Sequence, residues 1–124
     1  MNSQDLYERL LFFAKECLTF SKTLPRSISN IEYGKQLIRS SGSVGANYIE
    51  AVEALSKKDF IHRLRISRKE AKESTHWLLL IQHGNSDYQK IQQCTQTLIE
   101  EAQQLIKILS ASVTTVQGKM KNNK

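Results

Sequence analysis

The amino-acid sequence predicts an all-α protein, an antiparallel up-down-up-down bundle of four helices. Two observations carry this prediction. Apolar residues recur at alternating spacings of four and three along most of the chain, which is the period of a packed helix. The 124 residues also include only one proline and five glycines, so we expect long helices with short connections. Short connections make consecutive helices antiparallel neighbours.

The first helix is expected from about Gln4 to Thr23. Pro25 ends it, because a residue that precedes proline is pushed out of helical geometry. Its apolar seam keeps the four-three spacing and consists of Leu6, Leu10, Phe13, Cys17, Phe20 and Leu24.

The second helix is expected to begin near Ser27 or Ser29, either of which can cap it, and to run to about Leu55. Its centre is almost entirely small, since residues 40 to 46 read SSGSVGA. Two glycines inside a helix cost about 1 kcal/mol each relative to alanine. Close approach of the third helix, which also carries small residues in its seam, would offset that cost. The alternative is a break at Gly42 or Gly45.

The third helix is expected from Ser56 to His83. Ser56 is a good N-cap, and Asp59 can complete a capping box near the positive end of the helix dipole. Its apolar seam consists of Phe60, Leu64, Ser67, Ala71, Ser74, Leu78 and Ile81.

The fourth helix is expected from about Asp87 to Ser112 or slightly beyond, after a turn at Gly84, Asn85 and Ser86. Its seam consists of Ile91, Thr95, Leu98, Ala102, Leu105, Leu109 and Ser112. We therefore expect one domain, a bundle over residues 1 to 117. Residues 118 to 124 are basic and polar and are expected to form a disordered tail.

The composition favours an anionic partner. The formal net charge is +6 and the isoelectric point is about 9.4, which suits a nucleic acid or a membrane surface. No apolar run reaches the roughly 20 residues of a membrane span, and the N-terminus lacks a signal-peptide pattern. The two cysteines, Cys17 and Cys94, form neither a disulfide framework nor a metal-binding spacing. They are interpreted as core residues of a protein in a reducing cytoplasm.

Positive charge is concentrated at the start of the third helix. Residues 57 to 72 include seven Lys or Arg against two acids. The side chains expected to bind nucleic acid are Lys57, Lys58, His62, Arg65, Arg68, Lys69 and Lys72. Phosphate contacts of this kind weaken steeply with salt. Aromatic residues are not interleaved with the basic ones, so base stacking is not indicated. The alternative interpretation is an ordinary solvated helix face.

Apolar residues off the main seams predict an interface between copies, because a large exposed apolar patch usually marks an interface. The residues assigned to it are Leu11, Leu18, Trp77, Ile99, Ile106 and Val113.

The sequence indicates no catalytic residues, no cofactor and no metal site, so we expect a protein that is not an enzyme. Glu73 and His76 have the Glu-x-x-His spacing of di-iron bundles, but those sites need two such pairs and two more carboxylates. Glu70 and Glu73 are instead expected to pair with Arg63 or Arg68. The glycine pair Gly42 and Gly45 is interpreted as helix packing, since the lysine of a phosphate loop is missing.

Residues 39 to 51, RSSGSVGANYIEA, followed by residues 56 to 60, SKKDF, resemble the four-helix-bundle proteins named after intervening sequences of 23S ribosomal RNA genes. The resemblance covers nearly the whole chain. It implies an antiparallel four-helix bundle and a ring-like homo-oligomer, with five copies as the expected number. Related accessory variability proteins of diversity-generating retroelements share the bundle and the ring, and they bind nucleic acid and a reverse transcriptase.

The resemblance brings no catalytic residues. Asn47 and Glu50 match its motif without a role more specific than structural, and Tyr48 and Ile49 replace the commoner Ile-Ala. We therefore expect a cytoplasmic, oligomeric protein that binds RNA or DNA through its third helix. The competing hypothesis is an assembly or adaptor protein that holds a protein partner and binds no nucleic acid.

Overall fold

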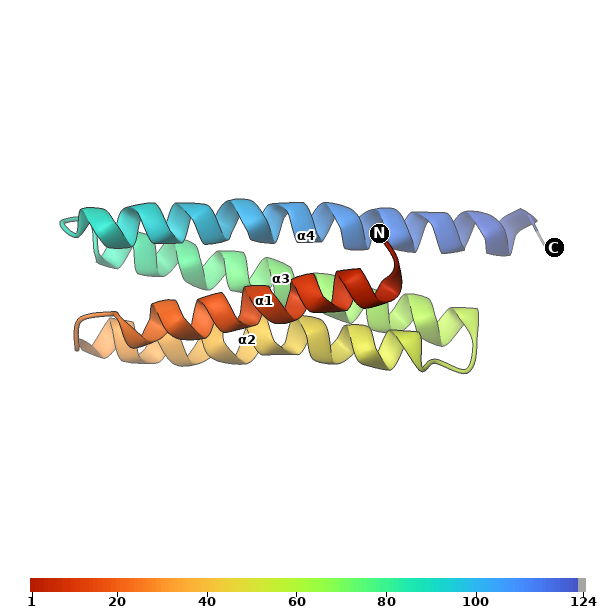
Figure 1. The fold of residues 1–124 in the computed structure, drawn as a ribbon, viewed down its shortest axis with the longest axis horizontal. Helices are drawn as coiled ribbons and strands as arrows, with labels where there is room; N and C mark the ends of the chain where they lie inside the picture. The colour runs from red at the N-terminus through yellow and green to blue at the C-terminus, as the bar shows by residue number, and fades with distance from the viewer. Residues whose placement is uncertain (123–124) are drawn as a thin grey trace.

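Four long helices make up the protein in a computed structural model, which describes residues 1 to 122 and the side chains of residues 1 to 120. They are α1 (Ser3–Lys22), α2 (Ile28–Val52), α3 (Lys57–Gly84) and α4 (Gln89–Asn122), and they lie lengthwise beside one another (Figure 1). The described part of the chain contains no strand. The prediction of an all-α chain with four helices is confirmed.

Side chains cap three of the helices at the positions where the chain turns. The backbone N–H of Asp5 donates to Asn2 Oδ1 at 2.8 Å before α1, and that of Asn30 donates to Ser27 Oγ at 3.0 Å before α2. The N–H of Asp59 donates to Ser56 Oγ at 3.1 Å before α3. Each bond satisfies a backbone donor that has no partner within the helix. The expected caps at Ser27 and Ser56 are confirmed.

Contacts between α2 and α3 show that these two helices run in opposite directions. Asn30 near the start of α2 bonds to Asn85 just after α3, at 2.8 and 3.0 Å. Further along α2, Ser40 bonds to Ser74 at 2.8 Å. Figure 1 shows the chain reversing direction at each of the three turns.

All four helices contribute to one core. Most predicted seam positions are buried, and Leu10, Leu37, Leu64, Leu78 and Leu105 are fully buried. Leu55 is the clear exception, since it is 98% exposed. The sequence predicts Leu55 at the end of the second helix, but α2 ends at Val52 and leaves Leu55 in the turn.

The two glycines of α2 do not break the helix, so the alternative of a break is wrong. They also do not face α3. A Cβ at Gly45 would lie 3.8 Å from Leu10 and Tyr7 of α1, and a Cβ at Gly42 would meet nothing within 4 Å. Gly45 therefore faces α1, where an added Cβ would make ordinary van der Waals contacts, whereas Gly42 lies open on the surface.

Serines provide the close contact between α2 and α3 that was expected of the small residues. Ser67 Oγ donates to the backbone carbonyl of Val44 at 2.7 Å, and the hydroxyls of Ser40 and Ser74 are 2.8 Å apart. Ser40, Ser67 and Ser74 are completely buried. A side chain can bond to the backbone of a neighbouring helix only where the two helices lie very close, and burial makes each such bond costly to lose.

Glu70 has a different partner from the one expected. Its carboxylate is 3.3 Å from the Arg39 guanidinium of α2, which also contacts Glu73 at 2.7 Å, so the assignment to Arg63 or Arg68 is wrong. These contacts raise the pKa of the Arg39 guanidinium above its usual value, and the contact with Glu70 contributes most. Arg39 thus links α2 to two positions of α3.

The last helix is longer than expected. It extends to Asn122, ten residues past Ser112, and includes residues 118 to 122 of the segment assigned to a disordered tail. Residues 123 and 124 of that segment lie outside the described residues. None of the described helices is both long enough and apolar enough to cross a membrane.

We expect Gly42→Ala to raise the free energy of unfolding by about 1 kcal/mol, because alanine favours the helix and the new Cβ meets no atom. This corresponds to a rise of about 3 to 6 °C in Tm. The reverse change one turn away, Ala46→Gly, should lower stability by a similar amount. Thermal unfolding followed by circular dichroism measures both. A loss of stability in Gly42→Ala would mean that another chain packs against Gly42.

Arg39→Gln should lower the free energy of unfolding by about 1 to 3 kcal/mol, since it leaves the Glu70 carboxylate buried without its cation. The double variant Arg39→Gln/Glu70→Gln should recover most of this loss, because it removes the buried charge as well. Urea unfolding of the two variants and the wild type measures the difference. Equal stability of the single and double variants would contradict the role assigned to Arg39.

Candidate nucleic-acid interface

The predicted nucleic-acid-binding residues lie on the outward side of α3. Six of them are exposed, and these are Lys57, Lys58, His62, Arg65, Lys69 and Lys72. Arg68 differs, because it is only partly exposed and its Nη1 donates to Ser110 Oγ of α4 at 3.3 Å. Arg68 therefore joins α3 to α4 beside the exposed residues.

The exposed basic side chains form a continuous stripe because of their spacing. Residues three and four apart are neighbours on one helix face. We use "α3 ridge" for the stripe Lys58, His62, Arg65, Lys69, Lys72 and His76, all of which are exposed. The buried stripe of the same helix, which includes Leu64, Ala71 and Leu78, lies on its opposite side.

The charge of the α3 ridge is not compensated by ion pairs. The described residues form ion pairs between Arg9 and Glu101 and between Arg39 and the carboxylates of Glu70 and Glu73, and none of these includes a ridge side chain. Like charges three or four apart destabilise a helix by about 0.2 to 0.5 kcal/mol per pair. A bound polyanion would replace that repulsion with attraction.

Acidic residues divide the α3 ridge into two parts. At the start of α3, a hollow of about 280 Å³ is lined by Glu50, Glu53 and Asp59 together with His62 and Arg63. Lys57 and Lys58 belong to this mixed end. The segment from Arg65 to Lys72 contains one acid, Glu70, and this side chain is buried and faces Arg39. The strongest positive surface is therefore the middle of α3.

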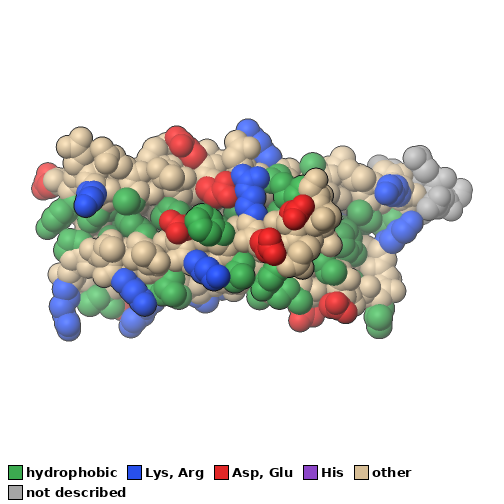
Figure 2. All heavy atoms as spheres, viewed as in Figure 1, with side chains coloured by type: hydrophobic (Ala, Val, Ile, Leu, Met, Phe, Trp, Pro, Cys, Tyr) green, Lys and Arg blue, Asp and Glu red, His purple; other side chains and the backbone are tan. Residues whose placement is uncertain are grey.

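Figure 2 shows that the face on the α1 side of the molecule has a different character. There Lys and Arg side chains alternate with Asp and Glu across α1 and α4, with apolar side chains between them. Arg9 of α1, for example, forms two hydrogen bonds with Glu101 of α4, at 2.7 and 2.9 Å. The segment of α3 from Arg65 to Lys72 differs, because it has exposed basic side chains and no exposed acid.

The Glu73 and His76 pair takes part in other contacts. Glu73 binds Arg39, and the His76 ring lies edge-on to Trp77 with centroids 4.9 Å apart. Within the described residues, no group of three or more His, Cys, Asp or Glu side chains could hold a metal ion.

Burial raises the pKa of the Cys17 thiol to about 12, so this cysteine remains protonated inside the core.

The predicted interface residues fall into three groups. Leu11 and Leu18 are 37% and 40% exposed on α1. Trp77 and Ile106 are partly buried against the core, and Trp77 stacks on Tyr33 with centroids 5.8 Å apart. Ile99 and Val113 are each 4% exposed and belong to the core of a single chain, so their assignment to a surface between copies is wrong.

Sequence reasoning missed a set of exposed apolar residues on α2 and α1. Ile31, Ile38, Ile49 and Val52 of α2 are 40 to 47% exposed, and Phe12 of α1 is 60% exposed. The signal was present, because Ile31 and Ile38 are seven residues apart and do not belong to the core seam. The small residues at the centre of α2 are the more conspicuous pattern and mask this second stripe.

The fold and the α3 ridge together define a basic four-helix-bundle protein with an exposed cationic helix. The family model of the 23S rRNA-intervening sequence protein matches residues 2 to 111, so the chain belongs to that family. Among solved structures, it is similar to a protein of unknown function from the S23 ribosomal protein family of Bacteroides thetaiotaomicron, with 28% sequence identity and a TM-score of 0.80. That likeness covers 92% of this chain and 99% of the other. A comparison with curated proteins found no match.

Arg65→Glu should raise the free energy of unfolding by about 1 kcal/mol. The substitution replaces the repulsion of Arg65 from Arg68 and Lys69 by two attractive pairs. In both pairs the acid precedes the base along the helix, which is the more stabilising order. Lys107→Glu on α4 is the matched control, because residues three and four positions away from it carry no charge, and we expect a change below about 0.5 kcal/mol. Urea unfolding at low salt measures both. A destabilised Arg65→Glu variant would mean that Arg65 has a partner within the protein.

Proposed function

We propose that this protein binds structured RNA or duplex DNA through phosphate contacts with the α3 ridge. The observation that carries the proposal is the run of exposed cationic side chains on α3 that form no ion pair within the described residues. A surface of this kind exchanges repulsion between its own charges for attraction to phosphates and releases counterions when it binds. The basic side chains are regularly spaced along the helix, which suits the phosphate backbone of a nucleic acid, where charges also occur at regular intervals.

We further propose that the protein acts in the cytoplasm as a ring-like homo-oligomer of five copies, without catalysing a reaction. The exposed apolar side chains of α1 and α2 support an assembly, since burying apolar surface between copies is favourable. They lie on helices other than α3, so assembly leaves the α3 ridge open. The resemblance to retroelement accessory proteins extends the proposal to an accessory role beside a reverse transcriptase.

A second candidate function is an adaptor that holds a protein partner and binds no nucleic acid. The specific observation in its favour is the stripe of Ile31, Ile38, Ile49 and Val52 on α2, apolar side chains that are each 40 to 47% exposed. The two functions predict different results in the same binding experiment.

The logarithm of the affinity for a labelled RNA hairpin and for a DNA duplex should fall linearly with the logarithm of the salt concentration. The triple variant Arg65→Glu/Lys69→Glu/Lys72→Glu should lower affinity at least tenfold, and it should reduce the salt slope by about 3, one for each lost phosphate contact. Fluorescence anisotropy across a salt series measures both quantities.

The control is Lys15→Glu/Lys90→Glu/Lys107→Glu, which changes the net charge by the same amount at exposed positions of α1 and α4. It should leave most of the affinity and the salt slope unchanged. Equal losses in both triple variants would show that only the net charge matters. No binding by the wild type at low salt would exclude the α3 ridge as a nucleic-acid site and favour the adaptor.

A further inference from the structure

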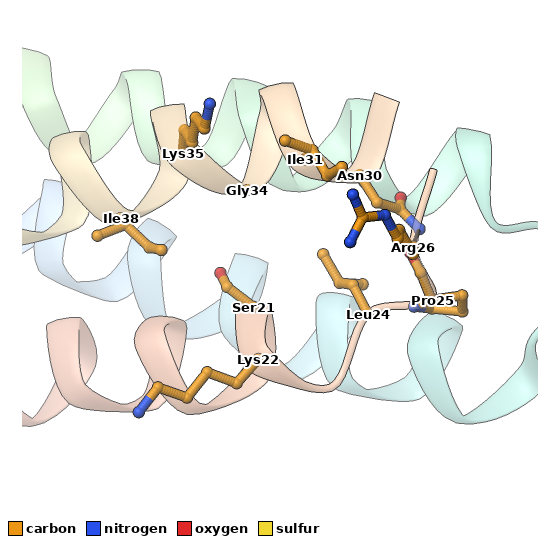
Figure 3. Close-up of a pocket in the computed structure, with 10 residues that line it drawn as sticks. All are labelled: Ser21, Lys22, Leu24, Pro25, Arg26, Asn30, Ile31, Gly34, Lys35 and Ile38. Carbon is orange, nitrogen blue, oxygen red and sulfur yellow. Dashed lines mark hydrogen bonds between the residues drawn. The ribbon is translucent and has the colours of Figure 1, made fainter. Parts of the chain in front are cut away.

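A hollow of about 340 Å³ opens where α1 ends and α2 begins (Figure 3). Its lining residues come from the end of α1, the turn and the start of α2, and they are Ser21, Lys22, Leu24, Pro25, Arg26, Asn30, Ile31, Gly34, Lys35 and Ile38. Leu24, Ile31 and Ile38 supply apolar walls, and Gly34 leaves room because it has no side chain. A volume of this size is at the lower end of the range for ligand pockets and suits one ring-sized apolar group.

Three basic residues are among those that line the hollow. Lys22, Arg26 and Lys35 all line it and are all exposed, and its lining contains no acid. Figure 3 shows these three side chains coming from three different segments around the hollow. None of them forms an ion pair in the described part of the chain. The hollow is therefore complementary to an apolar group flanked by negative charge.

This chain carries such a group on α1. Phe12 is 60% exposed and its side chain has no polar atom, whereas the exposed ring of Tyr88 has a hydroxyl that water can solvate. Glu8 and Glu16, one turn before and one turn after Phe12, are exposed on the same face of α1. Neither forms an ion pair within the described residues.

The chain cannot place its own Phe12 in its own hollow. Phe12 lies one turn from Arg9, which pairs with Glu101, and is therefore on the α4 side of α1. The hollow opens on the α2 side of α1, ten residues further along. Two different surfaces that must meet between copies give a heterologous contact, which builds a closed ring or an open filament.

We propose that Phe12 of one copy inserts into the hollow of a second copy, with Glu8 and Glu16 beside Lys22, Arg26 and Lys35. This inference rests on the homo-oligomer of the proposed function and names the contact that joins its copies. Phe12 is the anchor, since buried aromatic side chains carry a large part of the binding energy in protein interfaces. The charged residues around it fix the register and exclude other pairings.

Two variants test the two halves of the contact. Phe12→Asp removes the anchor, and Lys22→Glu/Lys35→Glu reverses the charge around the hollow. Each variant alone should sediment at the monomer mass of 14.2 kDa at concentrations where the wild type is an oligomer. Leu79→Asp, at an apolar position of α3 that is 50% exposed, should keep the wild-type mass. Circular dichroism establishes that all the variants are folded.

Mixing the two variants distinguishes this contact from any symmetrical one. The Phe12→Asp chain still has an intact hollow, and the Lys22→Glu/Lys35→Glu chain still has Phe12, so one contact can form between them. The mixture should sediment as a particle of two chains and no larger. The variant Glu8→Lys/Glu16→Lys/Lys22→Glu/Lys35→Glu, in which both charged surfaces are reversed, should recover the wild-type mass.

An oligomer that survives Phe12→Asp would overturn the proposed contact and leave the homo-oligomer standing, and so would a mixture that stays monomeric. A wild-type chain that sediments as a monomer at all concentrations would overturn the homo-oligomer together with this contact. Binding of nucleic acid, measured separately, is independent of both results.

Discussion

The direct contact between α2 and α3 is the interaction on which the rest of the structure depends. Ser67 donates to the backbone of Val44, and Ser40 meets Ser74 in the same buried seam. Hydroxyl groups are small enough to let two helices lie close together, and in a buried seam they are stable only when they are paired. The contact therefore fixes both the distance between the helices and the rotation of α3 about its axis.

That rotation determines what α3 presents to solvent. With its small stripe held against α2, the stripe on the opposite side must face outward, and that stripe is the α3 ridge. Arg39 of α2 reinforces this rotation by binding Glu70 and Glu73. These two acids of α3 therefore face α2 and do not neutralise the α3 ridge. Repulsion between the like charges of the ridge destabilises α3, and the contacts of the buried seam offset this loss.

The two surfaces that we assign to binding lie on different helices. The α3 ridge is uniformly positive over its middle part, whereas α1 and α2 combine exposed apolar side chains with separate acidic and basic groups. Uniform charge suits a polyanion that is contacted along its backbone, and mixed charge around an apolar anchor suits a protein surface that must find one register. Because the surfaces are separate, neither of the two proposed contacts covers the other.

The sequence by itself determined the number of helices, two of the caps, most of the core and the exposed cationic stripe of α3, because each of these follows from spacing along one helix. Periodicity says which residues share a face, but it does not say which neighbour that face meets. Only the tertiary structure decided that Gly45 faces α1, that Arg39 is the partner of Glu70, and that Ile99 and Val113 are core residues. The hollow between α1 and α2 was equally beyond prediction, since its shape depends on how two helices diverge at a turn.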